Sequence, residues 1–157
     1  MLRRALELLQ SSSLGRWLRS SGLFSWTIES IGSGDIGRRG EKLAAKFLRK
    51  QGYKIISHSH RQRLGEIDLI AVDQNVVVFV EVKTWRSDRL ADPSEAVTPS
   101  KQEKLTRAAL IYLKQKKLLD HPARFDVISI VLPSDDSPQI RHFKSAFEAV
   151  GSGQMYR

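Results

Sequence analysis

A valine-rich run that ends in charged residues constrains this chain more than any other feature of its sequence. Residues 76–80 are apolar throughout and mostly β-branched, which is typical of a buried central strand. Such a strand usually stays apolar to its end, yet this one continues into Glu81, Val82 and Lys83. Because side chains alternate between the two faces of a strand, Glu81 and Lys83 share the face of Phe79. One face of the predicted strand therefore changes from apolar to charged.

A second short strand precedes this run, and a turn joins the two. Residues 66–72 are mostly apolar, and residues 73–75 are polar and rich in turn-forming types. A two-residue turn at positions 74–75, with Asn75 at positive φ, predicts an antiparallel hairpin. Its register pairs Val72 with Val77, Ile70 with Phe79, Asp68 with Glu81, and Glu66 with Lys83.

Asp68 and Glu81 would thus face each other, and two like charges need a reason to do so. At a Cβ separation of about 5 Å they repel by roughly 3 kcal/mol at an effective dielectric near 20. Mg²⁺ supplies a reason, because it prefers oxygen ligands and is held by one or two carboxylates plus substrate phosphate. The Val82 carbonyl is a third candidate ligand, and Lys83 would reach the attacking water or the developing charge. The simpler alternative is a solvated Asp68 and an ordinary ion pair between Glu81 and Lys83.

A glutamate also lies on the packed face of a predicted helix. Residues 38–50 have helical periodicity, with Glu41, Ala44 and Leu48 on one face and lysines and arginines on the opposite face, and Gly52 is predicted to stop the helix. Glu41 falls in the first turn, where the helix dipole favours negative charge. A dipole role is therefore the alternative to a role in the site.

A second helix is predicted to begin after residue 98. Thr98 suits the N-cap, and Pro99 suits the first helical position. Gln102 and Leu105 fall on the inward stripe, and Lys101 falls largely outward. Further strands are predicted at residues 53–58 and 124–132, and the segment 139–147 is either an edge strand or a short helix. The predicted fold class is α/β, in the order α-β-β-β-α-β, with a mixed central sheet flanked by helices.

Composition indicates one basic domain. The 157 residues are 41% apolar, enough for one ordinary core, and contain no cysteine for disulfides or thiolate metal sites. No stretch approaches the roughly 18 apolar residues of a membrane-spanning helix, and we expect a cytoplasmic protein. The formal net charge of +9 indicates a partner that is nucleic acid or an anionic surface. Phosphate contacts are predicted for basic residues that flank the site, with a generic solvated face as the alternative for each: Arg38, Arg39, Arg61, Arg63, Arg86 and Lys101.

The two predicted strands resemble a known family. Residues 65–71 and 78–84 are similar to the signature of uncharacterised protein family 0102, the YraN-like proteins, and the resemblance runs from about residue 37 to 131. That family resembles the restriction-endonuclease-like PD-(D/E)xK superfamily and the archaeal Holliday-junction resolvases. The proline that the superfamily carries before its aspartate is replaced here by Ile67.

The resemblance implies a restriction-endonuclease-like α-β-β-β-α-β core and a metal site. It implies that a glutamate of the first helix, matched by Glu41, completes the site of Asp68 and Glu81. Related nucleases often carry a glutamine or lysine on the second helix, and Lys101 or Gln102 matches that role; a core-edge amide is the alternative for Gln102. Members of this fold include proteins that have lost cleavage.

Three regions are expected along the chain. Residues 1–36 form an N-terminal basic, Ser-rich arm or short helix that docks on the domain, on a partner subunit or on DNA. A transit peptide is the alternative, against which the acidic residues Glu7 and Glu29 count. Residues 37–150 form the PD-(D/E)xK nuclease-like domain, and residues 151–157 form a flexible tail.

The predicted function is that of an endonuclease, dependent on Mg²⁺ or Mn²⁺, which hydrolyses phosphodiester bonds in branched or structured DNA in the manner of a Holliday-junction resolvase. Asp68, Glu81 and the Val82 carbonyl hold the metal, Glu41 assists, Lys83 acts on the nucleophile, and Glu66 orients Lys83. A two-fold homodimer would allow two strands to be cut symmetrically. The alternative is a non-catalytic nucleic-acid-binding module on the same fold.

Overall fold

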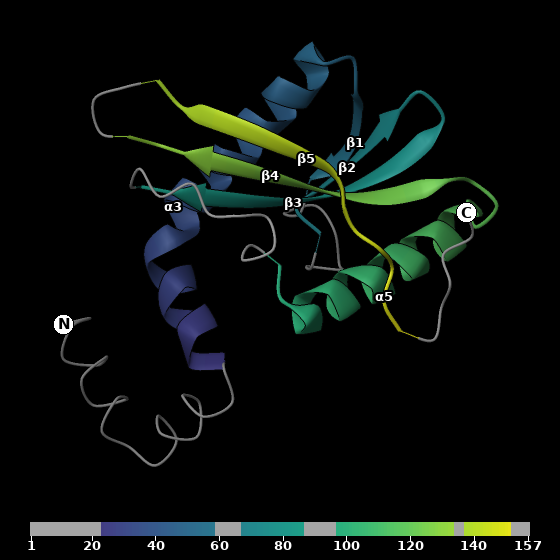
Figure 1. Cartoon of the computed structure of the whole chain (residues 1–157), viewed down its shortest axis with the longest axis horizontal. Coiled ribbons are helices and arrows are strands. Elements are labelled where there is room, and N and C mark those ends of the chain that lie inside the picture. Colours follow the sequence, from purple (N-terminus) through teal and green to yellow (C-terminus); the bar gives the residue numbers. More distant parts are fainter. Residues whose placement is uncertain (1–22, 59–66, 87–96, 134–136, 152–157) are drawn as a thin grey trace. The chain divides into compact units, whose positions relative to one another are not determined.

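The computed structural model describes residues 23–58, 67–86, 97–133 and 137–151, with side chains described from residue 35 onward. The chain forms two compact units, residues 1–36 and residues 37–157. The second unit holds every strand among the described residues (Figure 1). In the described part of the chain, no helix combines the length and the apolar character that crossing a membrane requires.

The second unit is built on a five-stranded mixed sheet, which confirms the α/β class. The strands are arranged in the order β1-β2-β3-β4-β5. Strands β3 and β4 are parallel, whereas the other neighbours are antiparallel. The last predicted element is therefore an edge strand and not a short helix. The elements are α3 (Leu23–Lys50), β1 (Lys54–His58), β2 (Leu69–Asp73), β3 (Val76–Trp85), α5 (Pro99–Lys116), β4 (Ala123–Val131) and β5 (Gln139–Phe147).

The hairpin of β2 and β3 has the predicted register, with Val72 opposite Val77. Positive φ falls on the first turn residue, Gln74 at 56°, and not on Asn75 as predicted. The pairing ends at Leu69 and Val80, because β2 begins at Leu69 and not at residue 66. The expected ladder pair of Asp68 and Glu81 is therefore wrong in detail, since Asp68 lies just before the strand. The pair of Glu66 and Lys83 involves a residue outside the described ranges.

Helix α3 begins at Leu23, well before the predicted start at residue 38. Four glycines between residues 32 and 40 lower the local helix propensity and hide the earlier turns from a periodicity argument. Extending a helix that already exists costs less than nucleating one, so the chain remains helical through them. The helix ends at Lys50, and the predicted stop residue Gly52 follows with a φ of 90°, which allows the Tyr53 N–H to donate to the Leu48 carbonyl at 3.0 Å.

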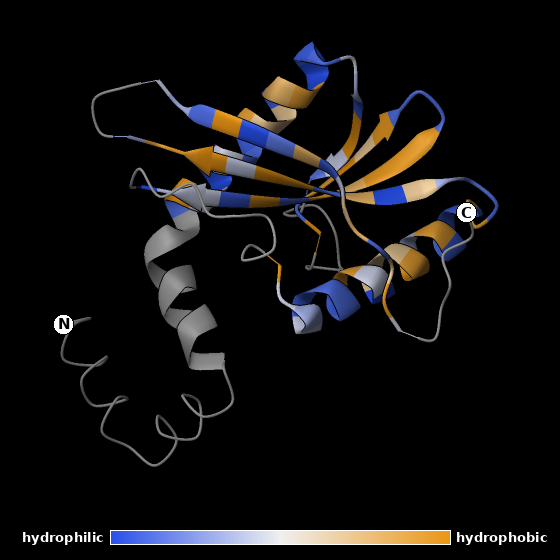
Figure 2. Cartoon of the chain, viewed as in Figure 1, coloured by the Kyte–Doolittle hydropathy of each residue, from blue (hydrophilic) through white to orange (hydrophobic). Residues whose placement is uncertain are grey.

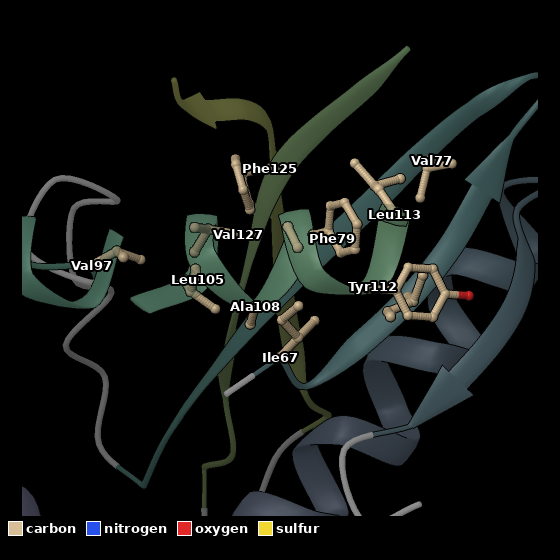
Figure 3. Close-up of a cluster of buried hydrophobic side chains, with 12 residues drawn as sticks. Ile67, Val77, Phe79, Val97, Leu105, Ala108, Tyr112, Leu113, Phe125 and Val127 are labelled. Carbon is tan, nitrogen blue, oxygen red and sulfur yellow. The ribbon is translucent and has the colours of Figure 1, made fainter. Parts of the chain in front are cut away.

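Each face of the sheet carries one apolar layer. On one face, Ala44, Ala45 and Leu48 of α3 pack with residues of the central strands, among them Val78 and Val80. On the other face, α5 packs over Phe79, and Figure 3 shows the side chains of this layer. Because both faces are covered, β3 and β4 are apolar over much of their length, whereas hydrophilic and apolar residues alternate along β5 and α5 (Figure 2). The α5 layer comprises Ile67, Ile70, Val77, Phe79, Val97, Leu105, Ala108, Ala109, Tyr112, Leu113, Phe125 and Val127.

Both edge strands contain a bulge. In β1, Ile55 pairs with Ala71 and Ser57 pairs with Ile70, so that Ile56 is an extra residue. In β5, the register shifts opposite residues 125–127, and Ser145 in this stretch has a φ of 50°. A bulge bends its strand and increases the local twist.

Candidate active site

Glu81 is a buried carboxylate in the middle of the sheet. It lies in β3, on the face of Phe79 that α5 covers, and its side chain is only 4% exposed. The Lys83 Nζ lies 3.3 Å from Glu81 Oε1, and the Lys101 Nζ lies 3.6 Å from Glu81 Oε2. Oε2 nevertheless accepts no hydrogen bond from the described residues. A buried oxygen of this kind is costly unless a ligand completes its environment.

Asp68 approaches the same point from the turn before β2. Its Oδ2 accepts a hydrogen bond of 2.7 Å from the backbone N–H of Val82. Burial raises the pKa of Asp68 well above its usual range, and the charges of Glu81 and Glu41 raise it further. The Val82 N–H and the Lys101 charge act in the opposite direction and are outweighed. Three carboxylates from three segments of the chain are therefore close enough to repel one another.

The backbone at Val82 adds a possible oxygen ligand to this group. The N–H and C=O of one strand residue point to the same side of the strand. Because the Val82 N–H points to Asp68, its carbonyl also points to the side of β2 and away from β4. The β2 ladder has ended by this position, since its last pair is Leu69 with Val80. The end of that ladder leaves an oxygen beside the Asp68 carboxylate.

Gly40 brings helix α3 against the end of β3. A Cβ atom at Gly40 would overlap Thr84 Oγ1 and would lie 3.0 Å from Thr84 Cβ. Only a residue without a side chain permits this approach. Glu41 is the next residue of the helix and is partly buried. The close contact thus fixes the distance of Glu41 from the charged end of β3.

The start of α5 delivers Lys101 to the site. Thr98 is the N-cap, as predicted, and its Oγ1 accepts a hydrogen bond of 3.3 Å from the Lys101 N–H, with Pro99 at the first helical turn. Lys101 is directed to Glu81 and is only 19% exposed, whereas helical periodicity placed it largely outward. The Gln102 side chain donates to the Val97 carbonyl at 3.1 Å and so supports the turn that precedes the helix.

The structure brings together Glu41, Asp68, Glu81 and Lys83, and it adds Lys101 to them. Within the described ranges, no three Asp, Glu, His or Cys side chains form a ready-made metal cluster. Arg38, Arg39 and Arg86 are exposed, whereas Arg61, Arg63 and Glu66 lie outside the described residues.

Ser129 is a site residue that sequence reasoning missed. It pairs with Lys83 across the parallel strands β3 and β4, is 3% exposed, and its hydroxyl has no hydrogen-bond partner among the described residues. A serine in the otherwise apolar stretch of residues 127–131 was the available signal. Its meaning depends on knowing that β4 lies beside β3, which the sequence does not state.

These features define a class: an α/β protein with a mixed five-stranded sheet and a buried centre of carboxylates and lysines. A family model described as "Uncharacterised protein family UPF0102" matches residues 40–130. The chain belongs to this family, which confirms the family resemblance seen in its strands.

Several relatives are similar to this chain over most of its length. A UPF0102 protein of Rhodopirellula baltica is 46% identical over 125 residues, which cover 77% of this chain and 75% of the relative. One from Geobacter sulfurreducens is 49% identical over 113 residues, covering 72% and 88%. One from Symbiobacterium thermophilum is 46% identical over 114 residues, covering 73% and 97%. The residues matched by the family model include β1 to β3, nearly all of β4, and the candidate site residues Glu41, Asp68, Glu81, Lys83 and Lys101.

Proposed function

We propose that this protein is a Mg²⁺- or Mn²⁺-dependent endonuclease of the cytoplasm, built on a restriction-endonuclease-like core. Its substrate is branched or otherwise structured DNA, in which it hydrolyses phosphodiester bonds as a Holliday-junction resolvase does. The order of elements from α3 to β4 and the residues of β2 and β3 support this assignment. The net charge of +9 is suited to a polyanionic substrate.

The observation that carries the proposal is the unsatisfied carboxylate oxygen of Glu81 beside the partly buried carboxylate of Asp68. Placing two carboxylates together away from water is unfavourable for a protein that only needs to fold. The arrangement becomes favourable when a divalent cation binds between them. Burial, and then the charges of Glu81 and Glu41, raise the pKa of Asp68, and such a cation would offset this cost of ionisation.

The donor atoms fit a hard cation. Asp68, Glu81 and the Val82 carbonyl would hold it, and Glu41 would complete the set directly or through water. A bound Mg²⁺ or Mn²⁺ supplies the positive charge that acidifies water and neutralises phosphate oxygens. Oxygen donors of this type favour Mg²⁺ and Mn²⁺ over the softer transition metals.

The lysines supply fixed positive charge on the same face of the sheet. Lys83 positions the attacking water and stabilises the charge that develops on the phosphoryl oxygens. Lys101 reaches the centre from α5 and is suited to hold a non-bridging phosphate oxygen. Glu66 lies outside the described residues, and its role of orienting Lys83 stays a prediction.

A non-catalytic nucleic-acid-binding module is the second candidate. Lys83 and Lys101 already pair with Glu81, and the described residues contain no closed cluster of three metal-ligating side chains. A protein that has lost cleavage would retain such ion pairs as part of its fold. Metal affinity separates the two functions, because a binding module has no need of a competent metal site.

The test uses the purified full chain with labelled four-way junction, flap, linear duplex and single-stranded DNA. Each substrate is incubated with Mg²⁺, Mn²⁺ or chelator, beside Glu81→Ala and Asp68→Asn variants whose folding is checked by circular dichroism. We expect metal-dependent cleavage that prefers branched DNA and disappears in both variants. DNA binding without cleavage, together with no heat of metal binding by calorimetry, would assign the protein to the second candidate.

A further inference from the structure

The outward face of α3 is unusual because each of its exposed side chains between residues 38 and 50 is basic. The apolar side of the helix, which includes Ala44, Ala45 and Leu48, is fully buried against the sheet. Glu41 is the acidic residue of this stretch, and it is partly buried and adjacent to the site. The exposed residues are Arg38, Arg39, Lys42, Lys46, Arg49 and Lys50, here called the α3 ridge.

The α3 ridge is a narrow, straight feature. At 3.6 residues per turn, its six positions fall within an arc of about 120° on the helix surface. At 1.5 Å per residue, it extends for about 18 Å along the helix axis. The contact of Gly40 with Thr84 places the start of the ridge at the charged end of β3, on the sheet face opposite Glu81 and Lys83, and Lys50 lies at the far end of the helix. The ridge therefore leads away from the candidate active site.

Overall composition does not explain this pattern. Helix α5 is also basic, with five lysines and arginines in its 18 residues, yet its exposed side includes Glu103 and the apolar Ile111. A face without a single exposed acidic or apolar residue is the expected match for a polyanion, because each position attracts negative charge and none repels it. Twelve residues of helix span the same length as about five phosphates of one DNA strand, at about 3.4 Å each.

We infer that the α3 ridge binds the phosphate backbone of the duplex arm that continues from the cleaved bond. The inference rests on the proposed function for the position of the scissile phosphate, but binding itself needs no cleavage. The ridge reads no base sequence, since phosphate contacts fix position without sequence information. It sets instead the length of duplex required beside the branch.

The test compares two variants with equal loss of charge. The ridge variant carries Lys42→Gln, Lys46→Gln, Arg49→Gln and Lys50→Gln. The control variant carries Lys104→Gln, Arg107→Gln, Lys114→Gln and Lys116→Gln, all exposed positions of α5. Affinity for a four-way junction is measured in chelator between about 50 and 200 mM salt, so that catalysis does not contribute. Binding to vesicles with anionic lipids is measured in parallel.

For the ridge variant we expect the slope of log Kd against log salt concentration to decrease by about 0.9 for each lost phosphate contact, or roughly three to four in total. The increase in Kd between the two salt concentrations should then be about 100-fold smaller than in the wild type. The control variant should retain the wild-type slope. Equal slopes for the two variants would overturn the inference, as would a ridge effect on vesicles alone.

A cross-linking experiment locates the contact. The chain has no cysteine, so Lys46→Cys provides a single attachment point for a photoactivated cross-linker. Cross-links should fall on duplex nucleotides within about five base pairs of the branch, and a matched Lys114→Cys protein should give few. If cross-links follow this pattern but no substrate is cleaved with metal, the ridge stands and the nuclease function fails. Metal-dependent cleavage together with cross-links scattered over the DNA would support the nuclease function and contradict the role of the ridge.

Discussion

The ionised Asp68 carboxylate is expected to lower the folding stability of the protein. Its carboxylate is held by the Val82 N–H in a place where Glu81 and Glu41 repel it. A neutral isostere would retain the hydrogen bond and remove the repulsion. Sites that hold like charges together commonly reduce the stability of the fold in this way.

Asp68→Asn should therefore raise the free energy of unfolding in chelator at pH 7, because the neutral amide escapes both the cost of burying a charge and the repulsion from Glu81 and Glu41. The folded pKa lies above the ordinary value of 3.8, so ionisation disfavours the folded state as pH rises from 3.8 through the folded pKa. Urea denaturation measured from about pH 3 to 8 should show a gain that vanishes below about pH 4. The exposed Asp120→Asn is the control, and a less stable Asp68→Asn protein would contradict the argument.

Gly40 provides a second test at the scale of single residues. Gly40→Ala places a methyl group on Thr84 and should reduce stability by about 1–3 kcal/mol, the usual cost of overpacking. Gly37→Ala in the same helix meets no atom within 4 Å and should increase stability by about 0.5–1 kcal/mol. Thermal unfolding of both variants measures this contrast. Equal effects would mean that α3 does not rest on Thr84.

At the scale of elements, a buried ionic cluster joins β5 to the sheet. Asp126 of β4 is fully buried and accepts hydrogen bonds from Arg124 at 3.0 Å and from the Ser145 N–H at 3.0 Å, with His142 Nε2 at 2.8 Å. Burial alone would raise the pKa of Asp126, but its bonds to His142, Arg124 and Ser145 lower it below the ordinary value. Arg124 extends the cluster to Asp73 at 2.9 Å, next to the β2–β3 turn.

Asp126→Asn should reduce stability at pH 7 by roughly 3 kcal/mol, because Arg124 loses its buried partner. The folded pKa of Asp126 is depressed, so its contribution is present above pH 3.8 and is lost as pH falls through the folded pKa. The free energy of unfolding of the variant should consequently depend less on pH in the acidic range than that of the wild type. Asp73→Asn, at a 28% exposed position, is the matched control and should cost less than about 1 kcal/mol. A cost as large as that of Asp126→Asn would contradict this account.

At the scale of the whole molecule, the sequence predicted what depends on neighbours in the chain. The register of β2 and β3, the stop at Gly52 and the cap at Thr98 all follow from local turn and capping chemistry. The ion pair of Lys101 with Glu81 depends on where α5 packs over β3, and the position of the unpaired Ser129 hydroxyl depends on the parallel pairing of β4 with β3. Periodicity gives the face of a helix, but it does not give the partner across the interface.

The charge of the whole chain bears on its assembly. Two copies at +9 each repel one another in free solution, and a polyanion shared between them removes this repulsion. A resolvase-like cut of two strands requires two sites related by a two-fold axis. We therefore expect two chains on each four-way junction in chelator, and mostly single chains without DNA at low salt. Sedimentation velocity measures both states, and symmetric cleavage by one bound chain would contradict the dimer.

The bulges in β1 and β5 affect how such a pair can form. An open sheet offers hydrogen-bonding groups along both edges, and a regular edge invites another strand to join it. Here Ile56 interrupts one edge, and the turn of the backbone at Ser145 interrupts the other. The bulges therefore disfavour the addition of a further strand at either edge of the sheet, whether from a second copy or in an aggregate. If two copies associate, we therefore expect them to meet through helices or loops and not through a shared sheet.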